Sequence, residues 1–215
     1  MKPNVTRRTL ILNLAGLLVA GPALAERLRP TPRQTAGPFY PVESPLDDDN
    51  DLVQVSGREG LANGEITHLN GHILDLNGQP LKGLRVEIWQ CDANGRYRHP
   101  YDRGGLPRDE NFQGFGHTIA DSEGRYRFRT IRPVPYPGRT PHIHMAVFPH
   151  GAPPFITQLY VAGEPRNERD FLYVRVPADK RPLLTAEFLP SQAEGARLSA
   201  SFDIVLGGGD GTPAG

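Results

Sequence analysis

Glycine and proline recur along this whole chain, with 24 and 22 copies among its 215 residues. Glycine allows tight turns, and proline fixes φ and removes a backbone donor, so both tend to end regular segments. This frequency fits many short strands joined by tight turns better than a helical bundle. No long amphipathic helical pattern opposes that expectation.

Alternation of side chains marks the expected strands. Residues 84–90 place Leu84, Val86 and Ile88 on one face, and residues 125–131 alternate charged and apolar side chains, as in a strand with one wet face. Further strands are expected in 71–76, 145–148, 156–161 and 201–206. Six or more short strands separated by turns predict an all-β fold, an antiparallel β-sandwich with long irregular connecting loops.

Residues 1–25 are predicted to be an export signal. Arg7-Arg8 forms a twin-arginine pair, residues 10–20 are an apolar run too short to span a membrane, and Ala23-Leu24-Ala25 is a small-x-small cleavage site. We expect a mature chain from Glu26, exported by a bacterium to the periplasm or beyond, with no membrane insertion after signal removal. The twin-arginine route, which carries folded proteins, is favoured; an ordinary secretory signal with an accidental arginine pair is the alternative.

The rest of the chain divides into three parts. Residues 26–64 are expected to form an irregular, proline-rich arm packed on the core, residues 65–206 the β-sandwich, and residues 207–215 a disordered tail. Within the arm, Asp47 to Asp51 resembles half of a calcium loop. It lacks the glycine and distal glutamate of an EF-hand, so a solvated acidic loop is the preferred interpretation.

Charge and cysteine content narrow the possible partners. The formal net charge is zero and the pI is about 7.1, so no basic field exists to recruit nucleic acid or an anionic membrane. The single cysteine, Cys91, cannot form an internal disulfide or a multi-thiolate metal site. We expect it to be a small buried side chain.

The most informative stretch runs from Tyr136 to His144. His142 and His144 flank Ile143 at the start of an apolar strand, so both imidazoles point to one face while Ile143 points into the core. Tyr136 precedes His142 by six residues, and Tyr97, like Tyr136, ends a turn that adjoins a strand. Two imidazoles and two phenols are candidate ligands of one metal ion.

The donor types favour ferric iron. Phenol has an ordinary pKa of about 10, so a strongly Lewis-acidic ion is needed to hold it deprotonated near pH 7. Ferric iron does this better than the common divalent ions, and zinc sites more often use histidine, cysteine and carboxylate. Two phenolates and one hydroxide would also cancel three positive charges, which matters in a desolvated pocket.

Several ordered motifs resemble the intradiol ring-cleavage dioxygenases, most of all the protocatechuate 3,4-dioxygenase type of subunit. The similarity covers about residues 31–206. The motifs are Thr35-Ala36-Gly37-Pro38, Ile88-Trp89-Gln90, Gly95-Arg96-Tyr97, Gly114-Phe115-Gly116, Pro135-Tyr136-Pro137, Arg139-x-Pro141-His142-Ile143-His144, Thr157-Gln158-Leu159-Tyr160 and Phe202 to Leu206.

The resemblance implies an enzyme with Fe(3+) as cofactor. Tyr97, Tyr136, His142 and His144 match the family's iron ligands, with Tyr97 also acting as a base, and Arg139 and Gln158 match residues beside the substrate. The implied reaction cleaves a catechol-type diol between its two hydroxyl-bearing carbons with O2, giving a cis,cis-muconate-type diacid. A homo-oligomer is expected, because this one chain carries the full ligand set.

The chain departs from the family pattern at two places. The loop between Tyr136 and His142 is short and lacks a tryptophan-containing insert, and His117 stands where the family usually has an arginine. Both changes are expected to alter the pocket wall, so the substrate is left at the level of a catechol. The alternative function is an exported, non-catalytic β-sandwich that binds sugar or protein.

Overall fold

The computed structural model describes residues 27–43 and 46–207; the predicted export signal and the tail from 208 onward lie outside them. The regular elements of the described residues are β1 (Ile66–Leu74), β2 (Arg85–Trp89), β3 (Phe115–Ile119), β4 (Arg125–Ile131), β5 (His142–Phe148), β6 (Phe155–Val161), the 3₁₀ helices η1 (Pro165–Arg169) and η2 (Ala178–Leu184), β7 (Thr185–Ala186), β8 (Leu189–Pro190), β9 (Leu198–Ser201) and β10 (Ile204–Val205).

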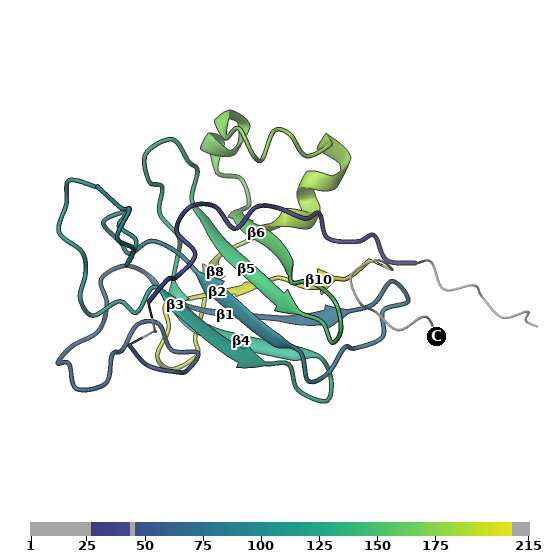
Figure 1. The fold of residues 1–215 in the computed structure, drawn as a ribbon, viewed down its shortest axis with the longest axis horizontal. Coiled ribbons are helices and arrows are strands. Elements are labelled where there is room, and N and C mark those ends of the chain that lie inside the picture. Colours follow the sequence, from purple (N-terminus) through teal and green to yellow (C-terminus); the bar gives the residue numbers. More distant parts are fainter. Residues whose placement is uncertain (1–26, 44–45, 208–215) are drawn as a thin grey trace, which may run out of the picture.

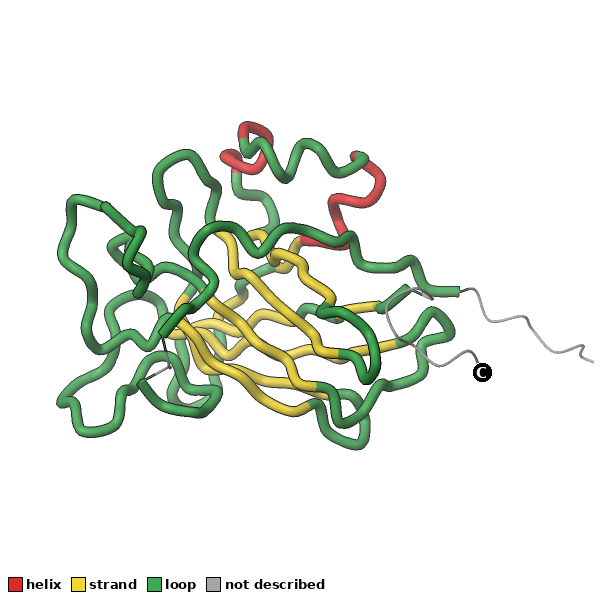
Figure 2. The backbone as a smooth tube through the Cα atoms, in the orientation of Figure 1, coloured by secondary structure: helices red, strands yellow, loops and turns green. Residues whose placement is uncertain are grey.

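The strands form two five-stranded sheets that pack face to face (Figure 1). One sheet has the order β3-β2-β5-β6-β7, and the other has the order β10-β1-β9-β8, with β4 also paired to β1. Long loops surround the strands, and the two helices lie together on one side of them (Figure 2). The predicted all-β sandwich with long irregular connections is thereby confirmed.

The pairing is not antiparallel throughout. β1 pairs antiparallel with β4, but its pairings with β9 and β10 are parallel, as is the pairing of β6 with β7. Parallel neighbours need a long crossover connection. Between β1 and β9 the chain passes through all five strands of the other sheet, and that path supplies the crossover.

Strand β3 is not among the strands expected from the sequence. Five residue pairs, from Arg85–Ile119 to Trp89–Phe115, join it to β2. A side chain at Gly116 would meet the backbone oxygen of Asp49 at 3.0 Å, so glycine lets the arm approach this edge strand closely. The acidic segment 47–51 is indeed a loop, and its Asp51 forms an ion pair with Arg129 at 2.8 Å.

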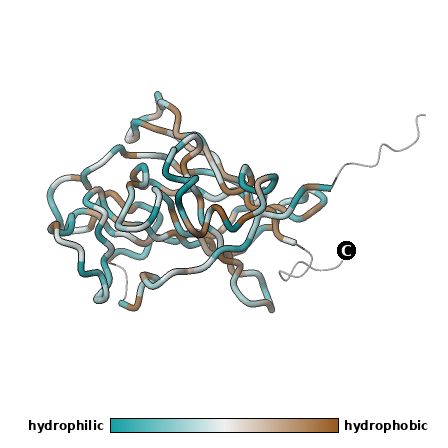
Figure 3. Tube along the Cα trace, turned by 90° about the horizontal axis from the view of Figure 1, so that it is seen from above, coloured by the Kyte–Doolittle hydropathy of each residue, from teal (hydrophilic) through white to brown (hydrophobic). Residues whose placement is uncertain are grey.

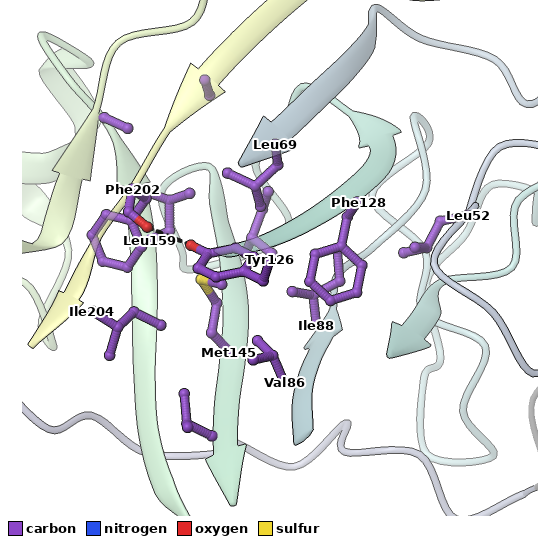
Figure 4. Packing of buried hydrophobic residues seen from close by; sticks show 14 of the residues in the cluster. Leu52, Leu69, Val86, Ile88, Tyr126, Phe128, Met145, Leu159, Phe202 and Ile204 are labelled. Atoms are coloured by element: carbon purple, nitrogen blue, oxygen red, sulfur yellow. Dashed lines mark hydrogen bonds between the residues drawn. The ribbon is translucent and has the colours of Figure 1, made fainter. Parts of the chain in front are cut away.

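The main core lies between the sheets. It is filled by buried side chains from both, among them Phe128, Ile88, Met145 and Leu69 (Figure 4). Hydrophilic and hydrophobic residues follow one another closely along the trace (Figure 3), so apolar side chains are spread over many segments of the chain. Cys91 is buried, and this burial raises the pKa of its thiol to about 12.

A second, smaller cluster lies on the other side of the β2–β5 pair and contains Trp89 and Tyr97. The arm crosses this side of the sheet (Figure 1), where the Gln34 amide donates to the Ile156 carbonyl. Three residues earlier in the arm, the Thr31 amide donates to the Val205 carbonyl. Within the described ranges, no helix is both long and apolar enough to cross a membrane.

Candidate metal centre

The two histidines of β5 converge on one point. Their Nε2 atoms lie 3.1 Å apart, and each residue is 1% exposed. Ile143, between them, points the other way and belongs to the main core. This geometry follows from the two-residue period of a strand, which puts alternate side chains on one face.

Neighbouring groups set the protonation of these imidazoles. His142 Nδ1 lies 2.7 Å from the carbonyl oxygen of Thr140, so Nδ1 carries the proton and Nε2 keeps its lone pair. Burial, reinforced by the charge of Arg139, lowers the pKa of His142 to about 3. Burial and the neighbouring His142 likewise lower the pKa of His144 well below its ordinary value. Both rings are therefore neutral at pH 7, the state in which imidazole binds a metal.

Two tyrosine rings complete the cluster. Tyr136 lies in the loop before β5, with its ring centroid 5.5 Å from that of His142, and Tyr97 lies in the loop after β2, with its centroid 5.3 Å from that of Tyr136. Tyr97 is 3% exposed, and its hydroxyl has no hydrogen-bond partner among the described residues. A buried hydroxyl without a partner is costly, and a bound ion would remove that cost.

Aromatic and arm residues enclose these four side chains. The indole of Trp89 stacks on His144 at 5.0 Å with an interplanar angle of 5°, and Phe39 of the arm stacks on Tyr97 at 4.7 Å. Gly37 has a φ of 68°, and a Cβ there would lie 3.3 Å from His144 Cε1. The arm can lie against His144 because glycine occupies this position.

Arg139 and Gln158 lie beside the cluster, as expected from the resemblance. Arg139 Nη1 is 3.4 Å from the Tyr136 hydroxyl and 3.4 Å from His142 Nε2. Its Nη2 donates to Gln158 Oε1 at 2.7 Å, and Gln158 Nε2 donates to the Thr35 carbonyl at 2.8 Å. Gln158 lies opposite His144 in the β5–β6 register, so the sheet fixes its position relative to the histidine.

A cavity of about 500 Å³ adjoins the cluster. Tyr136, Arg139 and Asp170 are among the residues that line it, together with residues of the short loop between Tyr136 and His142. Its volume falls within the usual range for small-molecule sites, about 300–1,000 Å³. His117 does not line this cavity; it lies on β3, with Nε2 3.1 Å from Asp48.

The donor set fits an iron ion of high charge better than a carboxylate- or thiolate-bound metal. No group of three or more histidine, cysteine, aspartate or glutamate side chains that could hold a metal occurs among residues 27–43 and 46–207. The four grouped donors are instead two imidazoles and two phenols. Burial raises the pKa of Tyr97 well above its ordinary value, so a strong Lewis acid is needed to hold it as phenolate.

Some residues near the candidate centre were not predicted from the sequence. Asp170 and Asn167 are buried and bind the loop that carries Arg139, yet they lie in a segment without periodic pattern. Tyr160, whose hydroxyl donates to Gln158 Oε1 at 2.9 Å, was part of a recognised motif but received no role. The arm is expected from the sequence to pack on the core, but the sequence does not predict that its Phe39 contacts Tyr97.

Comparison with known proteins places this geometry in a family. The model of a family described as dioxygenase matches residues 35–208. The chain is 38% identical over 199 residues to the protocatechuate 3,4-dioxygenase beta chain of Burkholderia cepacia, an alignment that covers 88% of this chain and 83% of that one. It is 30% identical over 186 residues to the catechol 1,2-dioxygenase of Candida albicans, covering 76% of this chain and 59% of the relative.

Solved structures that resemble this chain include dioxygenases as well. The dioxygenase domain of a dioxygenase and carbohydrate-binding protein fusion from Streptomyces sp. SirexAA-E has a TM-score of 0.62 and 32% identity, covering 83% of this chain and 99% of that one. Catechol 1,2-dioxygenase from Acinetobacter sp. ADP1 also has a TM-score of 0.62, with 27% identity over 82% of this chain and 62% of that one. With the family model matched along most of its length, this chain belongs to the intradiol ring-cleavage dioxygenases, a family of oxidoreductases.

Proposed function

We propose that this chain is an exported ferric dioxygenase. It would cleave a catechol-type diol between its two hydroxyl-bearing carbons, adding both atoms of O2 to give a cis,cis-muconate-type diacid. The observation that carries the proposal is the convergence of two neutral imidazoles, with Nε2 atoms 3.1 Å apart, and two phenols, one of them buried with no hydrogen-bond partner among the described residues.

Tyr97, Tyr136, His142 and His144 would hold the iron. Bound Fe(3+) would supply a Lewis-acidic centre that takes up both oxygens of the diol and makes the ring reactive toward O2. Two phenolates would cancel two of the three positive charges of the ion, which suits the buried position of these side chains.

Tyr97 is the proposed base. Its phenolate oxygen would accept a proton from a substrate hydroxyl, since burial raises the pKa of this phenol well above its ordinary value and makes the phenolate a strong proton acceptor. Tyr136 is not assigned the role of base, because it is less deeply buried than Tyr97 and Arg139 Nη1 lies 3.4 Å from its oxygen.

Arg139 is the proposed source of positive charge beside the substrate. Its guanidinium borders both the ligand cluster and the cavity of about 500 Å³. Negative charge that develops on the ring during reaction would be stabilised by this fixed cation in a site with little water. Gln158 would hold the same guanidinium from its other edge through the 2.7 Å bond to Nη2.

Colour and oxygen uptake test this function. Purified protein loaded with iron should absorb in the visible region through phenolate-to-iron charge transfer and consume O2 with at least one of catechol, protocatechuate or hydroxyquinol. Iron-loaded protein that is coloured but consumes no O2 with any of them would overturn the enzymatic proposal. A colourless protein that binds no iron would instead support the non-catalytic binding module, which the family membership does not favour.

Replacement of Tyr136 by phenylalanine separates the ligand role from packing. Tyr136→Phe should lose most of the visible band and at least about 100-fold in activity, because even residues behind metal ligands contribute roughly 10–100-fold. Tyr101→Phe is the matched control, since Tyr101 is 72% exposed and lies in a different loop. Full colour and turnover in Tyr136→Phe would contradict its assignment as a ligand.

Export and assembly are further parts of the proposal. The twin-arginine pair at Arg7-Arg8 and the small-x-small site at residues 23–25 support export, and a protein folded before transport could be loaded with metal in the cytoplasm. Mass spectrometry of the secreted chain should find Glu26 as its first residue. The presence of all four candidate ligands in one chain supports a homo-oligomer, which light scattering would detect as a mass at least twice that of one processed chain.

A further inference from the structure

Asp170 is the most deeply buried carboxylate near the candidate centre. Its side chain is 0% exposed, and it lies directly after η1, outside the motifs that carry the family resemblance. Burying a carboxylate is costly unless it is paired and hydrogen-bonded. Its partners therefore indicate what it does.

The two oxygens of Asp170 face two different segments. Oδ2 accepts from Arg139 Nε at 2.7 Å and from the Thr140 amide at 3.0 Å. Oδ1 accepts from the amides of Leu172 and Tyr173, both at 3.0 Å. One oxygen thus binds the side chain and the backbone of the short loop before β5, and the other fixes the carboxylate to its own segment.

A second buried contact connects the same segments. Thr140 Oγ1 donates to Asn167 Oδ1 at 2.8 Å, and Asn167 Nδ2 donates to the Val161 carbonyl at the end of β6, also at 2.8 Å. The loop is therefore anchored to the η1 region through both Asn167 and Asp170. Since Tyr136 and His142 stand at the two ends of this loop, its position matters for the candidate centre.

The pairing determines which edge of the guanidinium faces that centre. Nε is occupied by Asp170, and Nη2 is occupied mainly by Gln158 at 2.7 Å, with Asp170 Oδ1 at 3.4 Å. Within residues 27–43 and 46–207, Nη1 has only the long contacts of 3.4 Å with Tyr136 and His142. The one nitrogen without a short bond is thus the one that points toward the cluster.

We infer that Asp170 is a positioning residue, which holds Arg139 so that Nη1 faces the reacting ring. This inference rests on the proposed function. Electrostatic support of a transition state depends on a charge that is already in place, because a mobile arginine would have to be ordered during each turnover. Burial alone would raise the pKa of Asp170, but hydrogen bonds from Arg139 and the Thr140 amide outweigh it and lower the pKa, so the carboxylate stays ionised at pH 7.

Asp170→Asn tests the inference with the iron-loaded protein. The amide keeps the shape and one acceptor oxygen but loses the charge. We expect kcat to fall about 10–100-fold, as for other residues that orient a site, while KM, iron content and the visible band stay near the wild-type values. Glu168→Gln is the matched control, because Glu168 is an exposed carboxylate of the neighbouring η1; it should leave every one of these quantities unchanged.

A double-mutant comparison distinguishes positioning from a general structural role. If Asp170 acts only through Arg139, then adding Asp170→Asn to Arg139→Gln should change kcat by less than about twofold, within the additivity error of unlinked sites. This pair replaces two opposite charges by two amides, so it remains informative even where Asp170→Asn alone leaves a buried, unpaired arginine and does not fold.

Each outcome decides one claim. Wild-type protein with iron but no O2 uptake refutes the proposed function. Active wild type with an unchanged Asp170→Asn variant refutes the inference about Asp170, as does a further large loss of kcat when Asp170→Asn is added to Arg139→Gln. A loss of iron or of the visible band in folded Asp170→Asn would make Asp170 a support for the metal ligands instead, and that too would overturn it.

Discussion

Single residues of the arm contribute to the candidate centre by packing against its side chains, and they are not themselves candidate ligands. Gly37 is the clearest case, because its positive φ and its closeness to His144 both require the absence of a side chain. The surrounding arm is held by bonds from Gln34 to Ile156 and from Gln158 to Thr35. A residue far from the histidines in sequence thus forms part of the wall around them.

Gly37→Ala should therefore do two things. The left-handed φ should cost about 1–2 kcal/mol of unfolding free energy, and the added methyl group, 3.3 Å from His144 Cε1, should displace the arm and weaken iron retention. Gly163→Ala is the control, since its φ of 72° carries the same strain with open space around the Cβ. Urea unfolding should show a lower unfolding free energy in both variants. Dialysis against a chelator should release iron faster from Gly37→Ala than from Gly163→Ala. Equal iron retention in the two variants would refute the argument from the contact with His144.

At the scale of elements, β1 is the strand on which one sheet depends. It carries β4 on one edge and both β9 and β10 on the other, and Gly71 follows Asn70, the last residue that pairs with β9. The Phe202 backbone between β9 and β10 passes so closely that its carbonyl oxygen occupies the place of a Gly71 Cβ, and the Tyr126 hydroxyl donates to the same oxygen. Glycine at this position therefore lets two short strands share one edge.

Gly71→Ala should consequently destabilise the sandwich severely. The methyl group would overlap with backbone, which cannot move without breaking pairing to β9 or β10, so the loss should be about 3 kcal/mol or more, the upper end for overpacked sites. Gly105→Ala is the control, because nothing lies within 4 Å of its Cβ position. Chemical denaturation measures both, and a wild-type midpoint for Gly71→Ala would show that the strands can separate at low cost.

For the molecule as a whole, the buried histidines link stability to pH. In the folded metal-free protein the pKa of His142 is lowered to about 3, and that of His144 is lowered as well, whereas the unfolded chain has the ordinary value of about 6.5. Below pH 6.5 the two histidines are protonated in the unfolded state but stay neutral in the folded state. Stability from this source is fully present above about pH 6.5 and is lost as the pH falls toward 3.

The metal-free protein should accordingly be less stable at pH 5.5 than at pH 7. Near pH 5.5, the unfolding free energy should fall by about 1.4 kcal/mol per pH unit for each histidine. Urea unfolding at several pH values measures it, and the double variant His142→Gln/His144→Gln should show a much shallower dependence. Equal pH dependence in the two proteins would mean that other groups control acid unfolding.

The sequence by itself determined the fold class and the composition of the candidate centre. Frequent glycine and proline, with alternating apolar residues, favoured a β-sandwich, and the period of a strand put His142 and His144 on one face. These are local properties, fixed by backbone geometry within a few residues. The order of the motifs along the chain indicates Tyr97 and Tyr136 as the further candidate ligands.

Only the tertiary structure decided which distant segments meet. The parallel pairings of β1, the pairing of β3 with β2, the closeness of Gly37 to His144 and the bond from Arg139 to Asp170 all join residues far apart in the chain. No local pattern encodes such contacts, because they arise when the sheets pack and the connections between them are forced along particular paths. The sequence thus names the ligand types, and the packing of arm, loop and η1 determines how they are held.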